Sequence, residues 1–142
     1  MGAEEKEVDF DVIKEDWSRY RIEDGTILRL RINVIKIIRG KMGDLGYPEF
    51  GIHTRNLISA LVKDDLKGEP SKEPLKIPQD IEKELKFKVI EEKLQEYITR
   101  DGYKISVKPV LLKVFRTKKF NQFGEPIYVI SSHAIINVEK LR

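Results

Sequence analysis

The sequence predicts a mainly β protein that contains an internal tandem duplication, because two observations agree. Apolar and charged residues alternate with a period of two along several segments, which is typical of half-buried strands. Aligning the chain with itself at an offset of 77 residues pairs 5–41 with 82–118 and gives 13 identities in 37 positions. At an offset of 78 the match continues to Val138. The prediction divides one domain, 1–142, into repeat 1 (5–60), a polar linker (62–80) and repeat 2 (82–138).

The first strand of each repeat is expected from three alternating apolar residues: Val8, Phe10 and Val12 in repeat 1, and Leu85, Phe87 and Val89 in repeat 2. Taken alone, 78–99 also fits a helix, since Pro78 stands at its start and its apolar residues have a roughly helical spacing. Equivalent segments should share one conformation, and the period of two in repeat 1 favours strands. Only short helical turns are expected, at 15–19 and 92–96.

Each repeat then has an Asp-Gly pair between two β-compatible runs, Asp24-Gly25 and Asp101-Gly102. Because glycine tolerates the positive φ of tight turns, both pairs predict hairpins. The next strand of repeat 1 alternates, with Leu28, Leu30, Ile32 and Val34 inward and Arg29, Arg31 and Asn33 outward.

The alternation slips by one residue at Val34-Ile35 and at Leu111-Leu112, which predicts a β-bulge at equivalent places. Pro109 cannot donate a ladder hydrogen bond, so it is expected on an edge or beside the bulge. A polar, glycine-containing loop leads to the last strand, which is expected at 50–62 in repeat 1 and at 127–138 in repeat 2.

A unit of four strands and about fifty residues is smaller than most domains that are stable alone. We therefore expect both repeats to share one core around a pseudo-two-fold axis, as a barrel or as two packed sheets. The linker carries three prolines and many charges and is expected to be exposed. A helix in or after the linker would make the fold α+β.

Several repeated polar residues have a simple structural interpretation. Tyr20, Tyr97 and Trp17 are expected to be core anchors with a polar edge. Glu15 and Glu92 stand in highly charged segments and are expected on the surface. The repeated aspartates of the Asp-Gly pairs fit turn chemistry. None of these residues is predicted to be catalytic.

Composition limits the setting of the protein. Cysteine is absent, which excludes disulfides and thiolate metal sites and makes a reducing cytoplasm the simplest location. The N-terminal segment is acidic and lacks the features of a secretory signal, and no run approaches the ~18 apolar residues that a membrane span requires. We therefore expect a cytoplasmic protein without membrane contact. Charged residues reach 36 %, a composition that resembles those of heat-adapted proteins.

Positive charge is concentrated in two equivalent segments, 26–41 with five basic and no acidic residues and 103–119 with six and none. Basic stripes on strands suit the phosphate backbone of RNA or DNA, and a nearby aromatic side chain can stack on a base. Ordinary solvation of an outer strand face would give the same alternation. The candidate nucleic-acid-binding residues are Arg29, Arg31, Arg39, Lys41, Lys108, Arg116, Lys118, Lys119 and Phe120.

No recognised catalytic or metal-binding motif accompanies this charge pattern. The two histidines, His53 and His133, do not occupy equivalent repeat positions and have no companion ligands at a metal-binding spacing. We therefore expect no metal and no cofactor. The sequence predicts a non-enzymatic binding module, with nucleic acid first as its ligand. A protein-assembly or adaptor module, including self-association, comes second, and an enzyme of unknown type comes third.

Overall fold

A computed structural model describes residues 5–141; the first four residues of the acidic N-terminal segment lie outside this range. The mainly β prediction is confirmed, and the described residues contain no α-helix, only the 3₁₀ turn η1 (Asp64–Leu66) in the linker. The strands are β1 (Lys6–Val8), β2 (Phe10–Lys14), β3 (Ser18–Ile22), β4 (Ile27–Met42), β5 (Pro48–Leu61), β6 (Ile81–Leu85), β7 (Phe87–Glu91), β8 (Gln95–Thr99), β9 (Tyr103–Phe120) and β10 (Pro126–Lys140).

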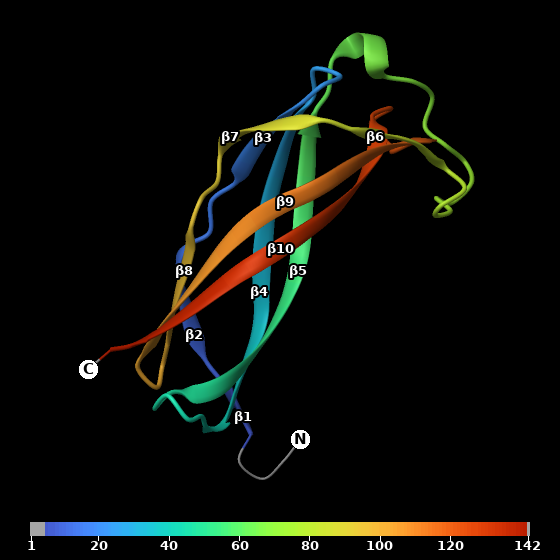
Figure 1. The fold of residues 1–142 in the computed structure, drawn as a ribbon. Coiled ribbons are helices and arrows are strands. Elements are labelled where there is room, and N and C mark those ends of the chain that lie inside the picture. The colour runs from blue at the N-terminus through green and yellow to red at the C-terminus, as the bar shows by residue number, and fades with distance from the viewer. Residues whose placement is uncertain (1–4, 142) are drawn as a thin grey trace.

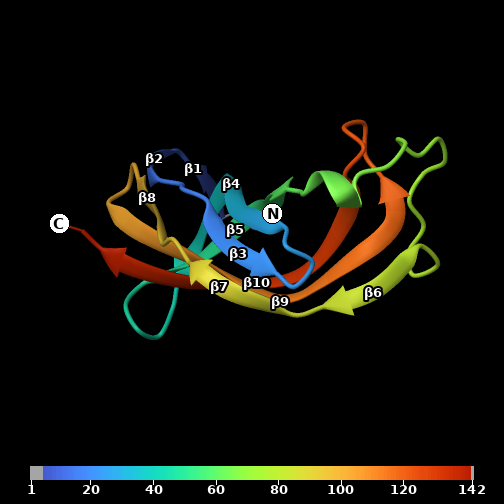
Figure 2. The ribbon, with the colours of Figure 1, turned by 90° about the horizontal axis from the view of Figure 1, so that it is seen from above.

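The strands form two five-stranded antiparallel sheets. Sheet A contains β1, β3, β4, β5 and β7, and sheet B contains β2, β6, β8, β9 and β10. The long β4–β5 and β9–β10 hairpins cross each other (Figure 1), and from above β9 and β10 form a curved layer beneath β3 and β4 (Figure 2). Neither sheet closes on itself within residues 5–141, so the barrel alternative is wrong. The packed-sheet alternative describes the fold.

Each sheet includes one strand from the other half of the chain. In sheet B, β2 pairs with β8, and in sheet A, β7 pairs with β3. The chain passes between sheets at 15–17 and 92–94, which have no regular secondary structure. The helical turns expected at 15–19 and 92–96 are therefore wrong, because these residues connect strands of opposite sheets. The strand interpretation of 78–99 holds for β6, β7 and β8.

The predicted glycine turns, bulges and Pro109 position are confirmed. Gly25 and Gly102 both have φ of 93°, a conformation that favours glycine. The β4–β5 register shifts between Val34 and Lys36, and the β9–β10 register shifts between Leu111 and Lys113, which are the two predicted bulges. Pro109 pairs with β10 on one side only, because β8 leaves β9 at Val107 and β6 joins it at Val114. Pro109 therefore lies where one side of β9 is open and next to the register shift, as predicted.

Two hydrophobic clusters lie between the sheets, and each contains side chains from both halves of the chain. In one, Tyr20, Leu28 and Leu30 pack with Leu111 and Val114. The other cluster contains Ile32, Val34, Ile37, Tyr97, Ile105 and Val107. Cooperative unfolding as a single domain stays a prediction.

The two halves also exchange polar contacts in reciprocal pairs. Tyr20 donates to Glu92 at 2.9 Å, and Tyr97 donates to Glu15 at 2.6 Å. Both tyrosines are fully buried, so the prediction of core anchors with a polar edge is confirmed for them. The two glutamates are partly buried beside the tyrosine hydroxyls, so their expected surface position is corrected.

A second reciprocal set consists of ion pairs. Arg116 lies 3.1 Å from Asp24, and Arg39 lies 3.1 Å from Asp101. These four residues, with the two tyrosines and two glutamates, are all identical between the aligned halves. Residues that match at the 77-residue offset therefore hold one half to the other.

The linker packs against the end of the β9–β10 hairpin. Gly68 donates its backbone N–H to the carbonyl of Gly124 at 2.8 Å, and Ser71 and Phe120 exchange two hydrogen bonds. A Cβ on Gly68 would lie 2.9 Å from the Phe120 ring, so linker backbone covers this aromatic face. Most linker side chains are nevertheless exposed, as expected. No helix among residues 5–141 has the length and apolar character needed to cross a membrane.

Candidate nucleic-acid interface

The outer face of sheet A gathers arginines from three adjacent strands. Arg29 on β4 is opposite Arg19 on β3, and Asn33 on β4 is opposite Arg55 on β5. Arg31 lies between Arg29 and Asn33 on the same face, since every second residue of a strand points the same way. We call this surface the arginine face: Trp17, Arg19, Arg29, Arg31, Asn33 and Arg55.

Trp17 lies against two of these arginines. The Cζ atoms of Arg31 and Arg29 lie 4.5 Å and 5.0 Å from the centre of the indole ring, within the range of cation–π attraction. Trp17 is partly exposed on the outer side of the sheet, so the expectation that it anchors the core is wrong. The indole thus lies on the guanidinium groups and retains exposed ring surface.

The arginine face has little compensating negative charge. Arg29 donates to the hydroxyl of Ser59 at 2.7 Å, and Arg19 lies 3.8 Å from Glu91, the one carboxylate that pairs with this face among residues 5–141. Within the same range, Arg29, Arg31 and Arg55 form no ion pair. Directly opposite like charges, such as Arg19 and Arg29, destabilise a sheet unless a counter-ion or ligand lies between them.

Three polar atoms on the arginine face are buried without a hydrogen-bond partner: Nε of Arg29, Nε of Arg31 and Oδ1 of Asn33. Leaving a buried donor or acceptor unpaired costs free energy, typically about 1–3 kcal/mol each. The three atoms follow one another along the outer side of β4. Two of these atoms are guanidinium donors of arginines without a carboxylate partner among the described residues, so this part of the face retains positive charge that an anion can neutralise.

Other predicted site residues are engaged in ion pairs. Arg116 is not available to bind a ligand, because its guanidinium donates to Glu82 at 2.7 Å and to Asp24 at 3.1 Å. The hydrogen bond to Glu82 is the main cause that raises the pKa of Arg116. Lys108 lies 4.0 Å from Glu92. With the Arg39–Asp101 pair, three of the predicted cations are neutralised by carboxylates.

Asp24 is the most buried of these carboxylates, with 6 % of its side chain exposed. Burial alone would raise the pKa of Asp24, but hydrogen bonds from the Thr26 amide and the hydroxyls of Tyr128 and Thr26, together with Arg116, outweigh burial and lower the pKa. Burial, together with the bond to Asp24, raises the pKa of Tyr128 above its ordinary value. This cluster is a structural ion pair.

The remaining predicted residues lie at the ends of the long strands. Lys41 is exposed near the end of β4, and Lys118 and Lys119 lie near the end of β9. Phe120 is half-buried under the linker. The structure brings Arg29 and Arg31 together and leaves the other seven predicted residues dispersed.

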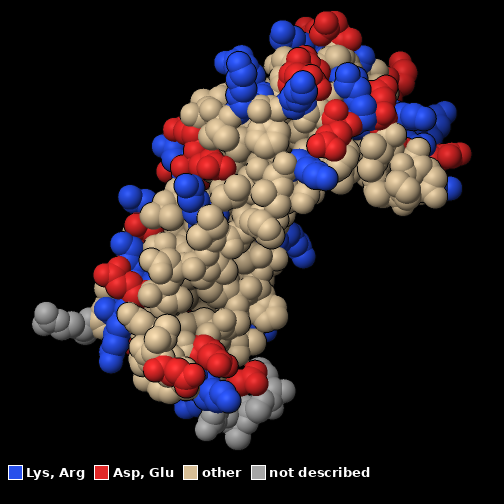
Figure 3. All heavy atoms as spheres, in the orientation of Figure 1, with Lys and Arg blue, Asp and Glu red and all other residues tan. Residues whose placement is uncertain are grey.

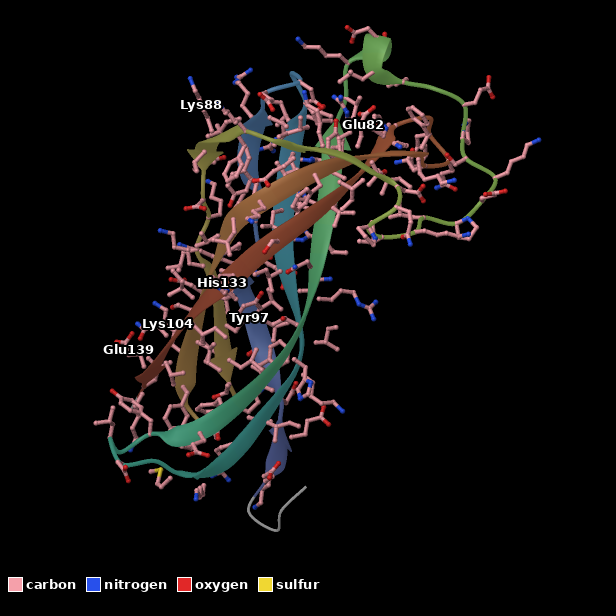
Figure 4. The ribbon with its side chains drawn as sticks, turned by 45° about the vertical axis from the view of Figure 1, so that its right-hand side comes forward. Glu82, Lys88, Tyr97, Lys104, His133 and Glu139 are labelled. Atoms are coloured by element: carbon pink, nitrogen blue, oxygen red, sulfur yellow. The ribbon has the colours of Figure 1, made fainter. Side chains whose placement is uncertain are left out.

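The outer face of sheet B differs from the arginine face. At the positions aligned with Trp17, Arg29 and Arg55 it carries Leu94, Ser106 and His133. Figure 3, which has sheet B in front, shows a largely uncharged band along the middle of this face with charges toward its margins. In Figure 4, His133 lies along β10 and Lys104 and Glu139 lie near one end of the β9–β10 hairpin. The two outer faces are therefore chemically unequal.

A separate hollow of about 400 Å³ lies between β5 and the β9–β10 turn. Its lining includes Ile58, Ala60, Phe123, Pro126 and Tyr128, and it is mainly apolar. No three His, Asp or Glu side chains within residues 5–141 are grouped so as to hold a metal ion. The hollow has no cluster of ionisable groups and is distinct from the arginine face.

Comparisons with known protein families, with curated proteins and with solved structures find no match for this chain.

Sequence reasoning located part of this face and missed the rest. It named Arg29 and Arg31 from their alternation but not Arg19, Arg55 or Trp17. The omitted arginines aligned with Glu96 and His133, so a search for charges repeated in both halves passed over them. The arginine content of 17–31, together with Arg55, could have indicated these residues. The strand register is needed to show that they lie on one face.

Proposed function

We propose that this protein is a non-enzymatic module that binds single-stranded nucleic acid on the arginine face. One observation carries the proposal: Arg29 and Arg31 lie against Trp17, Arg55 lies on the neighbouring strand β5, and these three arginines have no carboxylate partner among the described residues. Guanidinium groups bind phosphate with charge-assisted, often bidentate hydrogen bonds. The exposed side of the indole supplies a stacking surface for an unpaired base.

The spacing of these groups suits an extended strand of nucleic acid. Arg29 and Arg31 are two residues apart on β4, which separates their Cα atoms by roughly 6–7 Å. Successive phosphates of an extended single strand have a comparable spacing. A phosphate between Arg19 and Arg29 would also relieve their mutual repulsion. Because no base edge is read in this arrangement, we expect weak sequence preference and strong salt dependence.

The proposal includes the origin of the fold. We infer that the chain arose by tandem duplication and that its halves are related by a pseudo-two-fold axis. Support comes from the matching strand order of sheets A and B and from the reciprocal Tyr–Glu and Arg–Asp pairs. The outer faces would then have diverged, with ligand binding assigned to repeat 1. A cytoplasmic location remains part of this proposal.

Trp17 allows a direct test, because it is the single tryptophan of the chain. Titration with oligo(dT) or oligo(U) should quench its fluorescence at low salt, and added salt should reverse the quenching. Matched titrations with duplex DNA should give a weaker response. Absence of quenching, together with absence of binding by fluorescence anisotropy at low salt, would refute the proposal.

Charge reversal tests the arginines. The variant Arg29→Glu/Arg31→Glu should weaken binding by about tenfold or more and lower the salt slope by about 1.4, the value for two single-strand phosphate contacts. The control Lys72→Glu/Lys76→Glu changes net charge equally at exposed linker positions and should have a small effect. Equal losses in both variants would indicate a general charge effect and contradict the assigned site. Circular dichroism checks that each variant is folded.

Arg39 and Arg116 are unsuitable for this test. Both form ion pairs with aspartates of the other half, so reversing either charge would report on stability as well as on binding.

A further inference from the structure

The free edges of both sheets are formed by long strands. In sheet B, β10 spans 15 residues and pairs only with β9 among the described residues. In sheet A, β5 spans 14 residues and pairs only with β4. At the opposite ends of the sheets, β2 and β7 are only five residues long. An edge strand exposes unpaired N–H and C=O groups to which another strand can bind.

β10 lacks the charges that normally protect such an edge. The segment 126–138 contains no Asp, Glu, Lys or Arg, although charged residues make up 36 % of the chain. The equivalent segment of β5, 48–60, contains two charged residues, Glu49 and Arg55. The short edges β2 and β7 both contain charged residues of each sign. Natural monomers protect long edges with charges, proline or brevity, and the middle of β10 has none of these.

The side chains of β10 are exposed on both faces of the sheet. Ile135 is 58 % exposed and Ile136 is 43 % exposed, and adjacent residues of a strand point to opposite faces. Figure 4 turns this side of the molecule forward, with His133 midway along β10. An added strand would cover both isoleucines and satisfy the free backbone groups in one step.

The distribution of charged residues on the edge strands indicates which partner can pair with β10. Antiparallel pairing of β10 with β10 of a second copy can place uncharged residues opposite uncharged residues along 130–138. Pairing of β5 with itself near its centre would bring two copies of Arg55 together, and like charges are unfavourable at short range across strands. We propose that two copies of the chain associate through antiparallel β10–β10 pairing and join their B sheets into one continuous sheet.

The flanking charges narrow the register. In a two-fold antiparallel pair, the central residue is opposite its own copy. A pairing centred on Ser132 would place Glu125 opposite Glu139 of the second copy, which is unfavourable. Centres at His133 or Ala134 move Glu139 opposite Ile127 or Val129. β10 runs from Pro126 to Lys140, and a centre near the middle of the strand pairs the largest number of residues, so the centre is expected at 133 or 134.

The dimer lies on a surface separate from the arginine face, so its test needs no nucleic acid. Sedimentation velocity over a dilution series should give twice the 16.6 kDa chain mass at high concentration. A monomer across the whole series would overturn the proposal. Ile135→Lys places a charge on the edge and should shift the dimer to monomer, while Ile58→Lys, the control on β5, should leave the dimer intact. Loss of the dimer only in Ile58→Lys would also overturn it.

Cysteine crosslinking gives a second measurement that does not depend on disrupting the fold. The chain has no cysteine, so His133→Cys and Ala134→Cys each introduce a unique thiol. Residues opposite one another in an antiparallel pair have Cα atoms about 4.5–5.5 Å apart, which suits a disulfide. Mild oxidation should crosslink at least one of these variants and not Ile58→Cys. Failure of both β10 variants to crosslink would overturn the proposed pairing.

Discussion

Replacing Tyr97 with phenylalanine removes one oxygen atom from a contact between the two halves of the chain. The hydroxyl donates to Glu15 at 2.6 Å and accepts a hydrogen bond from the Nε2 atom of Gln95, also at 2.6 Å. The Gln95 side chain bonds both the N–H and the C=O of Ile32 in sheet A. Tyr97→Phe therefore leaves a carboxylate and an amide without this partner while it retains the buried ring.

The magnitude follows from these two bonds. A hydrogen bond to a charged group contributes about 1.5–3 kcal/mol, and a neutral one about 1 kcal/mol. Glu15 is partly exposed and regains some hydration in the variant. We expect Tyr97→Phe to lower the free energy of unfolding by about 2–3 kcal/mol, measured by guanidinium denaturation. Tyr20→Phe is the matched comparison, since the Tyr20 hydroxyl donates to Glu92 at the longer distance of 2.9 Å and also interacts with Ser18 and the Leu111 backbone, and it should cost about 1–2 kcal/mol.

A double-mutant cycle tests the assignment to Glu15. Tyr97→Phe and Glu15→Gln should show a coupling energy of about 1–2 kcal/mol, because each change removes the same contact. Zero coupling would refute the reasoning, even if both single variants were destabilised. An unchanged midpoint in Tyr97→Phe would refute it directly.

Two further outcomes are expected. Burial, with a neighbouring carboxylate, raises the pKa of Tyr20, Tyr97 and Tyr128 above the ordinary value near 10, so the folded state binds their protons more tightly than the unfolded state. This stabilisation is fully present below pH 10 and is lost as the pH rises toward the pKa values of the folded state, at about 1.4 kcal/mol per pH unit for each tyrosine. Denaturation at a series of pH values should show the decline, and Tyr97→Phe should reduce its slope. Asp24→Asn should cost about 2–4 kcal/mol and Asp101→Asn about 1 kcal/mol or less, because their side chains are 6 % and 31 % exposed; equal losses in thermal melts would contradict this difference.

The sequence was sufficient for the local features of the fold. Period-two alternation and two Asp-Gly pairs located most of the strands and both hairpins, and adjoining apolar residues located the bulges. Alternation states which face of a strand is buried but not which strand lies beside it. The placement of β2 with β8 and of β7 with β3 was therefore not predicted. The sequence reflects this placement in the glutamate and the tyrosine of the Tyr–Glu contacts, which are identical in both repeats.

The site was less accessible for the same reason. Arg29 and Arg31 were named from one strand, whereas Arg19 and Arg55 join them only through the register of neighbouring strands. The acidic partners of Arg39, Arg116 and Lys108 lie elsewhere in the chain, mostly in distant segments. Basic composition therefore overstated the free positive charge of 103–119.

The exchange of β2 and β7 between sheets also constrains how the chain is made. Phe10 pairs with Thr99, 89 positions later, so β2 has no partner strand until most of the polypeptide has left the ribosome. Such long-range pairing closes large loops before any contact compensates the lost entropy, and it slows folding. During synthesis, β2 therefore stays without its partner strand and the core side of β4 stays exposed until the second half of the chain is made. That half then completes both sheets.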